Sequence, residues 1–568
     1  MIPSAVIAIL TILLFSGVYT ALLGKKMAGQ GHRIGMVSAV AALLGSIYTL
    51  VAVTSSGPQQ FEFPLSNFLN YDWLSLSFYV DRLSALMMVL ISTVSTMIHI
   101  FSIGYMQGDP GYSRFFSRLG LMTFTLMAMV TSGSLFTLLV WWQLVTWFLY
   151  LLLSHNNENA VAVRSAFKTL VILRLGDAAL LCGAVLAYKC YGTLQFPDLF
   201  ERALSSSQTL QIWAGGPEIN SITAITLLLF VGAMAKSAQL PLNVWLPDTM
   251  DAPTPVSALM HAGIVNAGGF LINRLAPLYG ASPETLHLVF AVGFLTALVG
   301  TTIMLTRTDV KTMLGFSTMG QMGFMIMECG LGAFALAIFH LIAHGIFKAT
   351  LFLSAGSAIH KARKEPHLPP RQEDTESNVF RGLPWTTGVF MTLLFPLFIL
   401  VVSNKVVDAH IAQGTIVLLF FAWVTSSQAI FSLYSLRTVE SWRVSATMIS
   451  IVSFIVLTYV WATESFTGFL YPQPGEAARY FSAAAFPLWF FNSMICTVLA
   501  ILLSGWCLNF VDRRKAKSLL PQWAKALTPV LFMWFWNRLY LDSFYLRLER
   551  GLNSTIKKVD ASLPDWLP

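Results

Sequence analysis

Lysine and histidine side chains stand inside segments of this sequence that are otherwise apolar enough to lie in a lipid bilayer. They are Lys236, His261, His340, His344 and Lys348. One lysine at the centre of a membrane helix costs roughly 2.5–3.5 kcal/mol even on scales derived from insertion experiments. Ionisable residues that are kept at such a cost mark ion pathways in membrane proteins. We therefore predict that this chain moves an ion, and the titratable residue types favour the proton.

The composition agrees with a membrane setting. Hydrophobic residues make up 56% of the chain and charged residues 11%, whereas soluble domains are roughly 25% charged. The net charge of +8 comes from basic residues in short loops between apolar runs, so it is a topology signal and implies no nucleic-acid partner. The five cysteines lack the paired spacing of zinc or iron–sulfur sites. We expect no metal and no cofactor in this chain.

Apolar runs long enough to cross about 30 Å of hydrocarbon predict about 15 transmembrane helices. The expected fold is therefore an all-α polytopic membrane protein, with broken helices near residues 241 and 405. The predicted spans are 2–23, 34–54, 80–102, 119–132, 134–153, 166–190, 222–243, 254–278, 284–305, 310–329, 331–357, 385–410, 414–436, 444–461 and 482–511. The first span has no basic leader and no small-residue cleavage site, so we expect it to be retained.

Alternate loops differ sharply in their content of lysine and arginine. One set holds Lys25, Lys26, Arg33, Arg114, Arg118, Arg164, Arg307, Arg437, Arg443, Arg513, Arg514, Lys515, Lys517 and the segment 360–381 with five basic residues. The other set holds almost none, with Arg202 and Arg479 as exceptions. The positive-inside rule then predicts an N-terminus outside and a C-terminus in the cytoplasm, which an odd number of spans requires. The expected location is a bacterial inner membrane.

The segment 525–557 mixes aromatic side chains with Arg538, Arg547, Arg550 and Lys557. This pattern suits a helix that lies along the cytoplasmic face of the membrane. A docking surface for a cytoplasmic partner is an alternative, and the two interpretations are compatible.

His340, His344 and Lys348 are spaced four residues apart, so on one helix they form a stripe about 12 Å long. Neutral imidazole donates at one nitrogen and accepts at the other, and its ordinary pKa lies near physiological pH. Such a row can pass protons through the membrane interior. Two alternatives are a metal site, for which the sequence shows neither a neighbouring glutamate nor a third ligand, and histidines that serve only packing.

Lys236 is followed within a turn and a half by Pro241. Proline removes an amide donor and clashes with the preceding turn, and a broken helix at membrane depth is tolerated only where it lines a cavity or is buried in protein. We therefore expect water to reach Lys236, although a lysine that extends to the interface is an alternative. His261 follows a proline-rich loop in the same way.

Two further groups of charges lie in predicted spans. Arg174 and Asp177 are three residues apart and can pair on one helix face, either as a structural ion pair or as a coupling element. Lys405 lies close to Asp408 towards the outer end of the twelfth span. We interpret Lys405 as an exit group, with an interfacial lysine as the alternative.

Taken together, these residues resemble a proton-translocating family, which includes the antiporter-like subunits of respiratory complex I and of multisubunit Na+/H+ antiporters. The resemblance rests on Tyr79-Val-Asp-Arg-Leu-Ser84, Arg174-Leu-Gly-Asp177, Lys236-Ser-Ala-Gln-Leu-Pro241 and Phe347-Lys-Ala-Thr-Leu-Phe-Leu-Ser354. It implies a proton pathway that uses Lys236, His261, His340, His344, Lys348 and Lys405. It also implies a division into N-terminal helices (1–115), an antiporter-like core (116–410), C-terminal helices (411–511) and a cytoplasmic amphipathic tail (512–568).

One position departs from the complex I pattern. Subunits of that type carry a glutamate in the fifth helix within a Trp-Glu-Leu context, whereas this sequence reads Trp142-Gln143-Leu144. A carboxylate beside Lys236 would hold the lysine in its charged form, and glutamine cannot ionise. The resemblance therefore leaves charge-pair switching of the complex I type in doubt.

The phrases 257–270 and 317–334 look most like the membrane-spanning component of DAB-type inorganic-carbon accumulation systems. This likeness implies a two-part machine, in which the membrane component conducts a cation. The other part would be a large cytoplasmic protein with a zinc site, like that of β-carbonic anhydrases, that converts CO2 to bicarbonate. The chain itself would then belong to a transporter and would not be an enzyme. The alternatives are a proton-pumping component of a respiratory quinone oxidoreductase and a component of a cation/proton antiporter.

Overall fold

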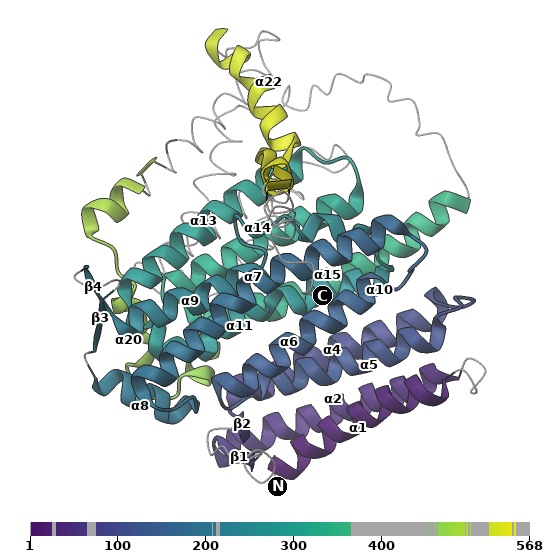
Figure 1. Ribbon diagram of the computed structural model, residues 1–568, viewed down its shortest axis with the longest axis horizontal. Coiled ribbons are helices and arrows are strands. Elements are labelled where there is room, and N and C mark those ends of the chain that lie inside the picture. The colour runs from purple at the N-terminus through teal and green to yellow at the C-terminus, as the bar shows by residue number, and fades with distance from the viewer. Residues whose placement is uncertain are drawn as a thin grey trace, which may run out of the picture.

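A computed structural model shows a bundle of long helices that run side by side (Figure 1). The structure describes residues 2–24, 30–64, 75–206, 208–211, 216–364, 464–494, 496–497, 522–547 and 550–551, with single residues at 450, 461 and 500. The predicted spans 385–410 and 414–436 lie outside the described residues, and so do nearly all of 444–461 and the part of 482–511 from 501 onwards. Lys405 and the break expected beside it are among them.

Helices occupy each of the first eleven predicted spans. They are α1 (Ile2–Leu23), α2 (Gly31–Ser56), α4 (Arg82–Tyr105), α5 (Tyr112–Val130), α6 (Leu135–Leu153), α7 (Ala160–Tyr191), α9 (Ser221–Lys236), α10 (Thr254–Ala262), α11 (Ala267–Arg274), α12 (Ala276–Tyr279), α13 (Pro283–Leu305), α14 (Val310–Gly330) and α15 (Phe334–Lys364). Side-chain N-caps begin several of them, such as Asp81 before α4, Ser134 before α6 and Asn220 before α9. Within the described residues, eight helices are long and apolar enough to cross a membrane. The predicted class of helical membrane protein is confirmed.

Two short antiparallel strand pairs, which the sequence analysis did not predict, lie in the connections between helices. Strand β1 (Gln59–Pro64) pairs with β2 (Ser75–Val80), and Phe61 faces Phe78 in this register. Strand β3 (Thr209–Gln211) pairs with β4 (Glu218–Asn220). Strands β3 and β4 lie near α8 (Phe196–Ser205) and α20 (Glu476–Ala483) at the left of Figure 1, and β1 and β2 lie at the bottom, near the N-terminus. Isolated bridges from Phe78 to Ser132 and from Ser134 to Gln195 connect β2 to the start of α8 at this end of the bundle.

The predicted span 222–243 is a shorter helix, because α9 ends at Lys236. The predicted span 254–278 contains an apolar helical run, Thr254–Arg274, that is long enough to cross a membrane. It is not one continuous helix, since the chain there is divided into α10, the short 3-10 turn η2 (Ile264–Asn266), α11 and α12. The break begins at Gly263, and the Asn266 side chain donates a hydrogen bond of 2.7 Å to the Ala262 carbonyl that the break exposes. A side chain that supplies this bond satisfies a backbone group that water cannot easily reach in a bilayer.

The two broken helices meet at Ser237, the first residue after α9. Its hydroxyl donates to the Val265 carbonyl at 2.6 Å and accepts from the Gly268 amide at 3.1 Å. Gly268 permits this approach, because a Cβ there would collide with Ser237 and with the backbone of Ala233. Irregular backbone from two helices is therefore collected at one buried place, as expected where such segments are enclosed by protein.

The C-terminal segment packs on the end of the bundle opposite to the strand pairs. It consists of α22 (Gln522–Trp536), the turn η4 (Arg538–Tyr540) and helical residues up to 547, and α22 stands at the top of Figure 1. Arg307, which follows α13, donates to the carbonyl of Trp536 at 2.7 Å. Tyr545 donates to the carbonyl of Pro241 at 3.2 Å, just beyond the break in α9.

Four alternating charges, which we call the charge ring, hold this segment to the bundle. Lys168 of α7 contacts Asp248 and Asp542 at 2.7 Å each. Arg538 contacts Asp248 at 2.6 Å and Asp542 at 3.2 Å. Asp248 belongs to η1 (Leu246–Asp251), the turn that follows the break at Lys236. The charge ring therefore links the C-terminal segment to the irregular backbone beside the buried lysine.

Arg538→Glu should release the C-terminal segment, because it places a third negative charge between Asp248 and Asp542. We expect limited proteolysis within residues 522–547 to become at least fivefold faster in detergent-solubilised protein, and the acceleration to weaken at high salt, where exposed charges are screened. Arg547→Glu makes the same charge change outside the charge ring and should leave the rate near that of the unmodified chain. Equal proteolysis of the two variants would contradict a docking role for the charge ring.

Candidate functional site

Lys236 is buried at the C-terminal end of α9, with 1% of its surface exposed. Its ammonium donates to the carbonyl of Trp142 on α6 at 2.8 Å and lies 4.5 Å from the centre of the Trp142 ring. The carbonyl and the π face both favour a cation. The alternative in which Lys236 extends to the interface does not agree with this geometry, because the side chain points into α6.

Asp177 on α7 joins the same group through Trp142. The Trp142 indole donates to one Asp177 oxygen at 2.8 Å, and the carboxylate lies close enough to attract the charge of Lys236. Asp177 also pairs with Arg174 at 3.5 Å, as the spacing predicts. The Asp177 side chain is buried, with 4% exposed, whereas that of Arg174 is partly exposed. Lys236 therefore has an acidic neighbour, which α7 supplies in place of the expected position on α6.

Gly176 explains why α7 can bring Asp177 to Lys236. A Cβ at Gly176 would collide with the side chain of Ala235, the residue before Lys236. Small residues at such crossings let membrane helices approach closely. Gln143 also lies beside the Asp177 carboxyl, so the amide that replaces the family glutamate contacts the acid that serves in its place. We call Trp142, Gln143, Arg174, Asp177 and Lys236 the lysine–aspartate cluster.

The three residues of the predicted row, His340, His344 and Lys348, lie on α15. His344 is close enough to the other two to feel their charges. The imidazole centres of His340 and His344 are 6.2 Å apart. Lys348 is 1% exposed and donates to the Ser317 hydroxyl at 2.9 Å and to the Leu314 carbonyl at 3.3 Å, both on α14. The row predicted from the spacing is therefore present as a stripe on α15, in which His344 and Lys348 are buried and His340 is half-buried.

His261 on α10 joins this row from the side. It is fully buried, its ring stacks on Phe352 of α15 with 4.3 Å between centres, and it lies close enough to feel the charges of Lys348 and His344. Within the described residues, neither ring nitrogen of His261 or His344 has a hydrogen-bond partner. Native proteins pair almost all buried polar atoms with protein groups or with ordered water. Histidines that serve only packing would leave these four nitrogens without compensation.

Two residues that the sequence analysis missed contact the row at His340. Glu328 on α14 is 1% exposed and contacts His340 Nδ1 at 3.0 Å. Gln321, also on α14, contacts His340 Nε2 at 2.9 Å. A carboxylate inside the apolar span 310–329 is the same signal that identified the lysines, so Glu328 could have been found from the sequence. We call His261, Glu328, His340, His344 and Lys348 the histidine row.

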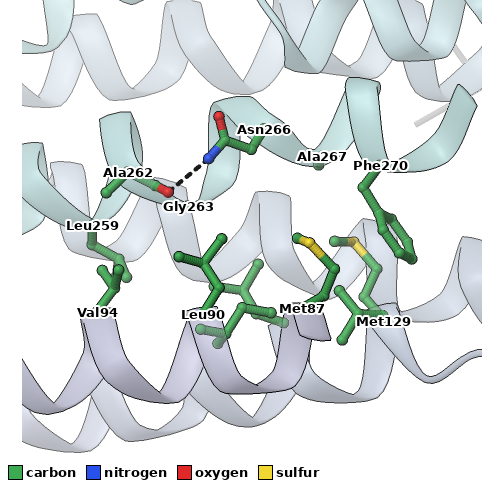
Figure 2. A pocket seen from close by; sticks show the side chains of 13 residues that line it. Met87, Leu90, Val94, Met129, Leu259, Ala262, Gly263, Asn266, Ala267 and Phe270 are labelled. Carbon is green, nitrogen blue, oxygen red and sulfur yellow. Dashed lines mark hydrogen bonds between the residues drawn. The ribbon is translucent and has the colours of Figure 1, made fainter. Parts of the chain in front are cut away.

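The lysine–aspartate cluster and the histidine row both adjoin the place where the broken helices meet, because Lys236 immediately precedes Ser237 and His261 lies on α10 just before the break at Gly263. Figure 2 shows a small cavity beside this break, between α4, α5 and the residues around Gly263. Its volume of about 20 Å³ is room for a single water. Apolar side chains such as Met87, Leu90 and Val94 line most of it, and the one polar side chain is that of Asn266.

Residues 132–369 match the protein family described as NADH:quinone oxidoreductase/Mrp antiporter, transmembrane. Residues 70–116 match the N-terminal part of chain 5 of NADH–ubiquinone oxidoreductase, complex I. The first match contains every residue of the lysine–aspartate cluster and of the histidine row.

The chain is 41% identical to the probable inorganic carbon transporter subunit DabB1 of Halothiobacillus neapolitanus, over 95% of both chains. It belongs to the family of antiporter-like membrane subunits. NADH–ubiquinone oxidoreductase chain 5 of Metridium senile, a second member, is 34% identical over 76% of this chain and 71% of its own length. NADH-quinone oxidoreductase subunit L of Neisseria meningitidis is 38% identical over 60% of this chain and 51% of its own length.

The fold agrees with this family. The Mrp complex of Dietzia sp. DQ12-45-1b contains a chain that superimposes with a TM-score of 0.64 and 20% identity, over 99% of this chain and 60% of the other. Both the resemblance to the family and the closer likeness to DAB-type membrane components are confirmed. The relatives of this chain carry names that describe them as subunits or chains of larger complexes.

Proposed function

We propose that this chain conducts protons across a bacterial inner membrane as the membrane component of an energy-coupled inorganic-carbon accumulation complex. The proposal rests on one observation. Two groups of buried titratable residues, the lysine–aspartate cluster and the histidine row, adjoin the place where the two broken helices meet. An inorganic carbon transporter subunit, similar over nearly the whole chain, supports the carbon part of the proposal. Under this proposal the chain is part of a transporter, and the chemistry of carbon belongs to a partner.

The proposed path runs from His340 through His344 to Lys348, continues to His261 and crosses the break to Lys236. The unpartnered nitrogens of His261 and His344 can each hold a water, and water between them would give the row continuous hydrogen bonds. On the far side, the Trp142 carbonyl and Asp177 receive the charged Lys236. Arg174 remains charged throughout and favours the ionised form of Asp177 when the lysine releases its proton.

The partner in this proposal is a large cytoplasmic protein that contains zinc and hydrates CO2. The basic loops and the C-terminal segment at one end of the bundle favour that end as the cytoplasmic side, with the N-terminus outside. A membrane potential of 100 mV is worth about 2.3 kcal/mol per charge. One proton per turnover would therefore favour accumulated bicarbonate by roughly fifty-fold.

A respiratory proton pump is the second candidate function, because chain 5 and subunit L of NADH oxidoreductases are also similar. In that case the same residues would move protons outward, driven by quinone chemistry in other subunits. The chain spans only about half the length of the Neisseria subunit L. We rank this function second, since the inorganic carbon transporter subunit matches along almost its full length.

Affinity purification of the full-length tagged chain from its native membrane tests the proposal. We expect one large partner that contains zinc, and we expect proteoliposomes of the complex to take up protons when a potential is imposed. Copurification of quinone-binding and hydrogenase-like subunits would favour the respiratory function instead. Proteoliposomes that hold a potential without proton flux would contradict both.

His344→Gln separates a relay from packing, because glutamine keeps hydrogen bonding but cannot titrate near neutral pH. We expect proton flux in proteoliposomes to fall at least tenfold. The matched control is His287→Gln on α13, where the imidazole stacks on Phe486 away from the histidine row, and its flux should stay within a factor of two. Near-normal flux in His344→Gln would assign this histidine to packing.

A further inference from the structure

Glu328 is a carboxylate buried among helices, two residues before the end of α14. Burial of an ionised carboxylate is costly unless it is paired and hydrogen-bonded. The pairing that the structure shows is with His340, at 3.0 Å between Oε2 and Nδ1. A protein that gains only stability from this position would do as well with an apolar residue, since a buried ion pair is weak evidence for stability.

The His340 imidazole lies between two partners, Glu328 and Gln321, and each of them can either accept or donate a hydrogen bond. At Nδ1 the Glu328 carboxyl accepts when it is ionised and donates when it is protonated. At Nε2 the Gln321 side chain lies at 2.9 Å, and an amide presents either its oxygen or its NH2 group when it turns over. Every protonation state of this imidazole therefore keeps two hydrogen bonds.

The other members of the histidine row differ in this respect. The Leu314 carbonyl and the Ser317 hydroxyl accept from Lys348 and thereby favour its protonated form. His261 and His344 have no protein partner among the residues that the structure describes. The pair of Glu328 and His340 can therefore hold a proton on either residue, because the hydrogen bonds of the pair are kept in both cases.

The pair also lies at one end of the row. At 1.5 Å per residue from the first residue of α15, His340 is about 9 Å along the helix and Lys348 about 21 Å. Glu328 lies next to the short turn that joins α14 to α15. In the proposed orientation this end faces the outside of the cell, from which protons would enter. The nearest described titratable neighbours are Cys329, beside Glu328, and His344, one turn from His340.

We propose that Glu328 and His340 form the site that loads protons onto the histidine row. This inference rests on the proposed function in proton conduction and adds a carboxylate to it. In the loading step Glu328 takes a proton from the outer side and becomes a neutral carboxylic acid. It then passes the proton to Nδ1 of a neutral His340 that already carries a proton on Nε2. The resulting imidazolium releases this Nε2 proton, beside Gln321, to a water that leads to His344. Glu328 is left ionised, and His340 is neutral with its proton on Nδ1. The imidazole must turn over, which returns this proton to the Nε2 side, before Glu328 can load a further proton.

Glu328→Gln tests the site, because glutamine has nearly the same shape but carries no exchangeable charge. In proteoliposomes of the full-length chain with its copurified partner, we expect proton flux to fall at least tenfold. Glu328→Asp should retain a substantial part of the flux, since the shorter carboxylate can still exchange a proton. Glu284→Gln on α13 is the control, because that partly exposed carboxylate contacts Thr223 outside the row, and it should leave flux unchanged.

The double variant Glu328→Gln/His340→Gln distinguishes a shared site from two separate ones. Residues that act as a unit are non-additive, so the double variant should conduct no more slowly than the worse single variant. Additive losses, or wild-type flux in Glu328→Gln, would overturn the inference while leaving proton conduction intact. If Glu328→Gln does not assemble, the flux of Glu328→Asp decides, and a loss as complete as in His340→Gln would then contradict a proton-exchanging carboxylate. A wild-type complex that conducts no protons would refute the proposed function itself.

Discussion

Lys236→Ala is expected to abolish proton flux and growth that depends on inorganic carbon at low CO2. The lysine is the only cation of its cluster that can release a proton, because Arg174 stays charged at all accessible pH. Its removal also leaves the Trp142 carbonyl and the Asp177 carboxylate without the charge that they face. Flux should fall at least a hundredfold, measured in proteoliposomes, while the amount of protein in the membrane stays within a factor of two.

Lys236→Arg is the sharper variant and should fail as well. Guanidinium preserves the positive charge beside Asp177 but cannot release a proton. The control is Lys189→Ala near the end of α7, where the lysine is exposed, and this variant should conduct normally. Wild-type growth of either Lys236 variant would remove this residue from the mechanism.

The sequence was sufficient to predict the long helices and the histidines and lysine of the histidine row, but not its carboxylate, Glu328. Both predictions depend on local information, because an apolar run of sufficient length crosses the membrane and a spacing of four residues places side chains on one face. The break after Lys236 was also expected, from Pro241. The division of 254–278 was not, since the break falls at Gly263, one of three glycines in this segment, and glycine is common in membrane helices.

The partners that buried charges find on neighbouring helices could not be predicted from the sequence. Asp177 reaches Lys236 because α7 and α9 approach at Gly176, and His340 reaches Glu328 because α14 and α15 are joined by a short turn. Such pairings depend on helix packing, which spacing along one segment does not specify. For the same reason the absence of a glutamate at Gln143 was interpreted as the absence of any carboxylate beside the lysine.

The neighbourhood of Gln143 changes what a carboxylate there would do. The amide lies beside Asp177, and Asp177 already faces Lys236. A glutamate would place two negative charges next to each other and on the same lysine. Like charges within a buried site disfavour joint ionisation, and the lysine between them would hold its proton more tightly.

Gln143→Glu is therefore expected to slow proton flux at least tenfold without impairing assembly. Gln211→Glu on β3 introduces the same carboxylate at an exposed position and should conduct normally. The two candidate functions make opposite predictions for this variant. A respiratory pump that had merely lost its glutamate should conduct equally or faster once the residue is restored. A chain in which Asp177 has become the acidic partner of Lys236 should conduct more slowly, and adding Asp177→Asn to Gln143→Glu should then recover part of the flux, because a single carboxylate again faces the lysine.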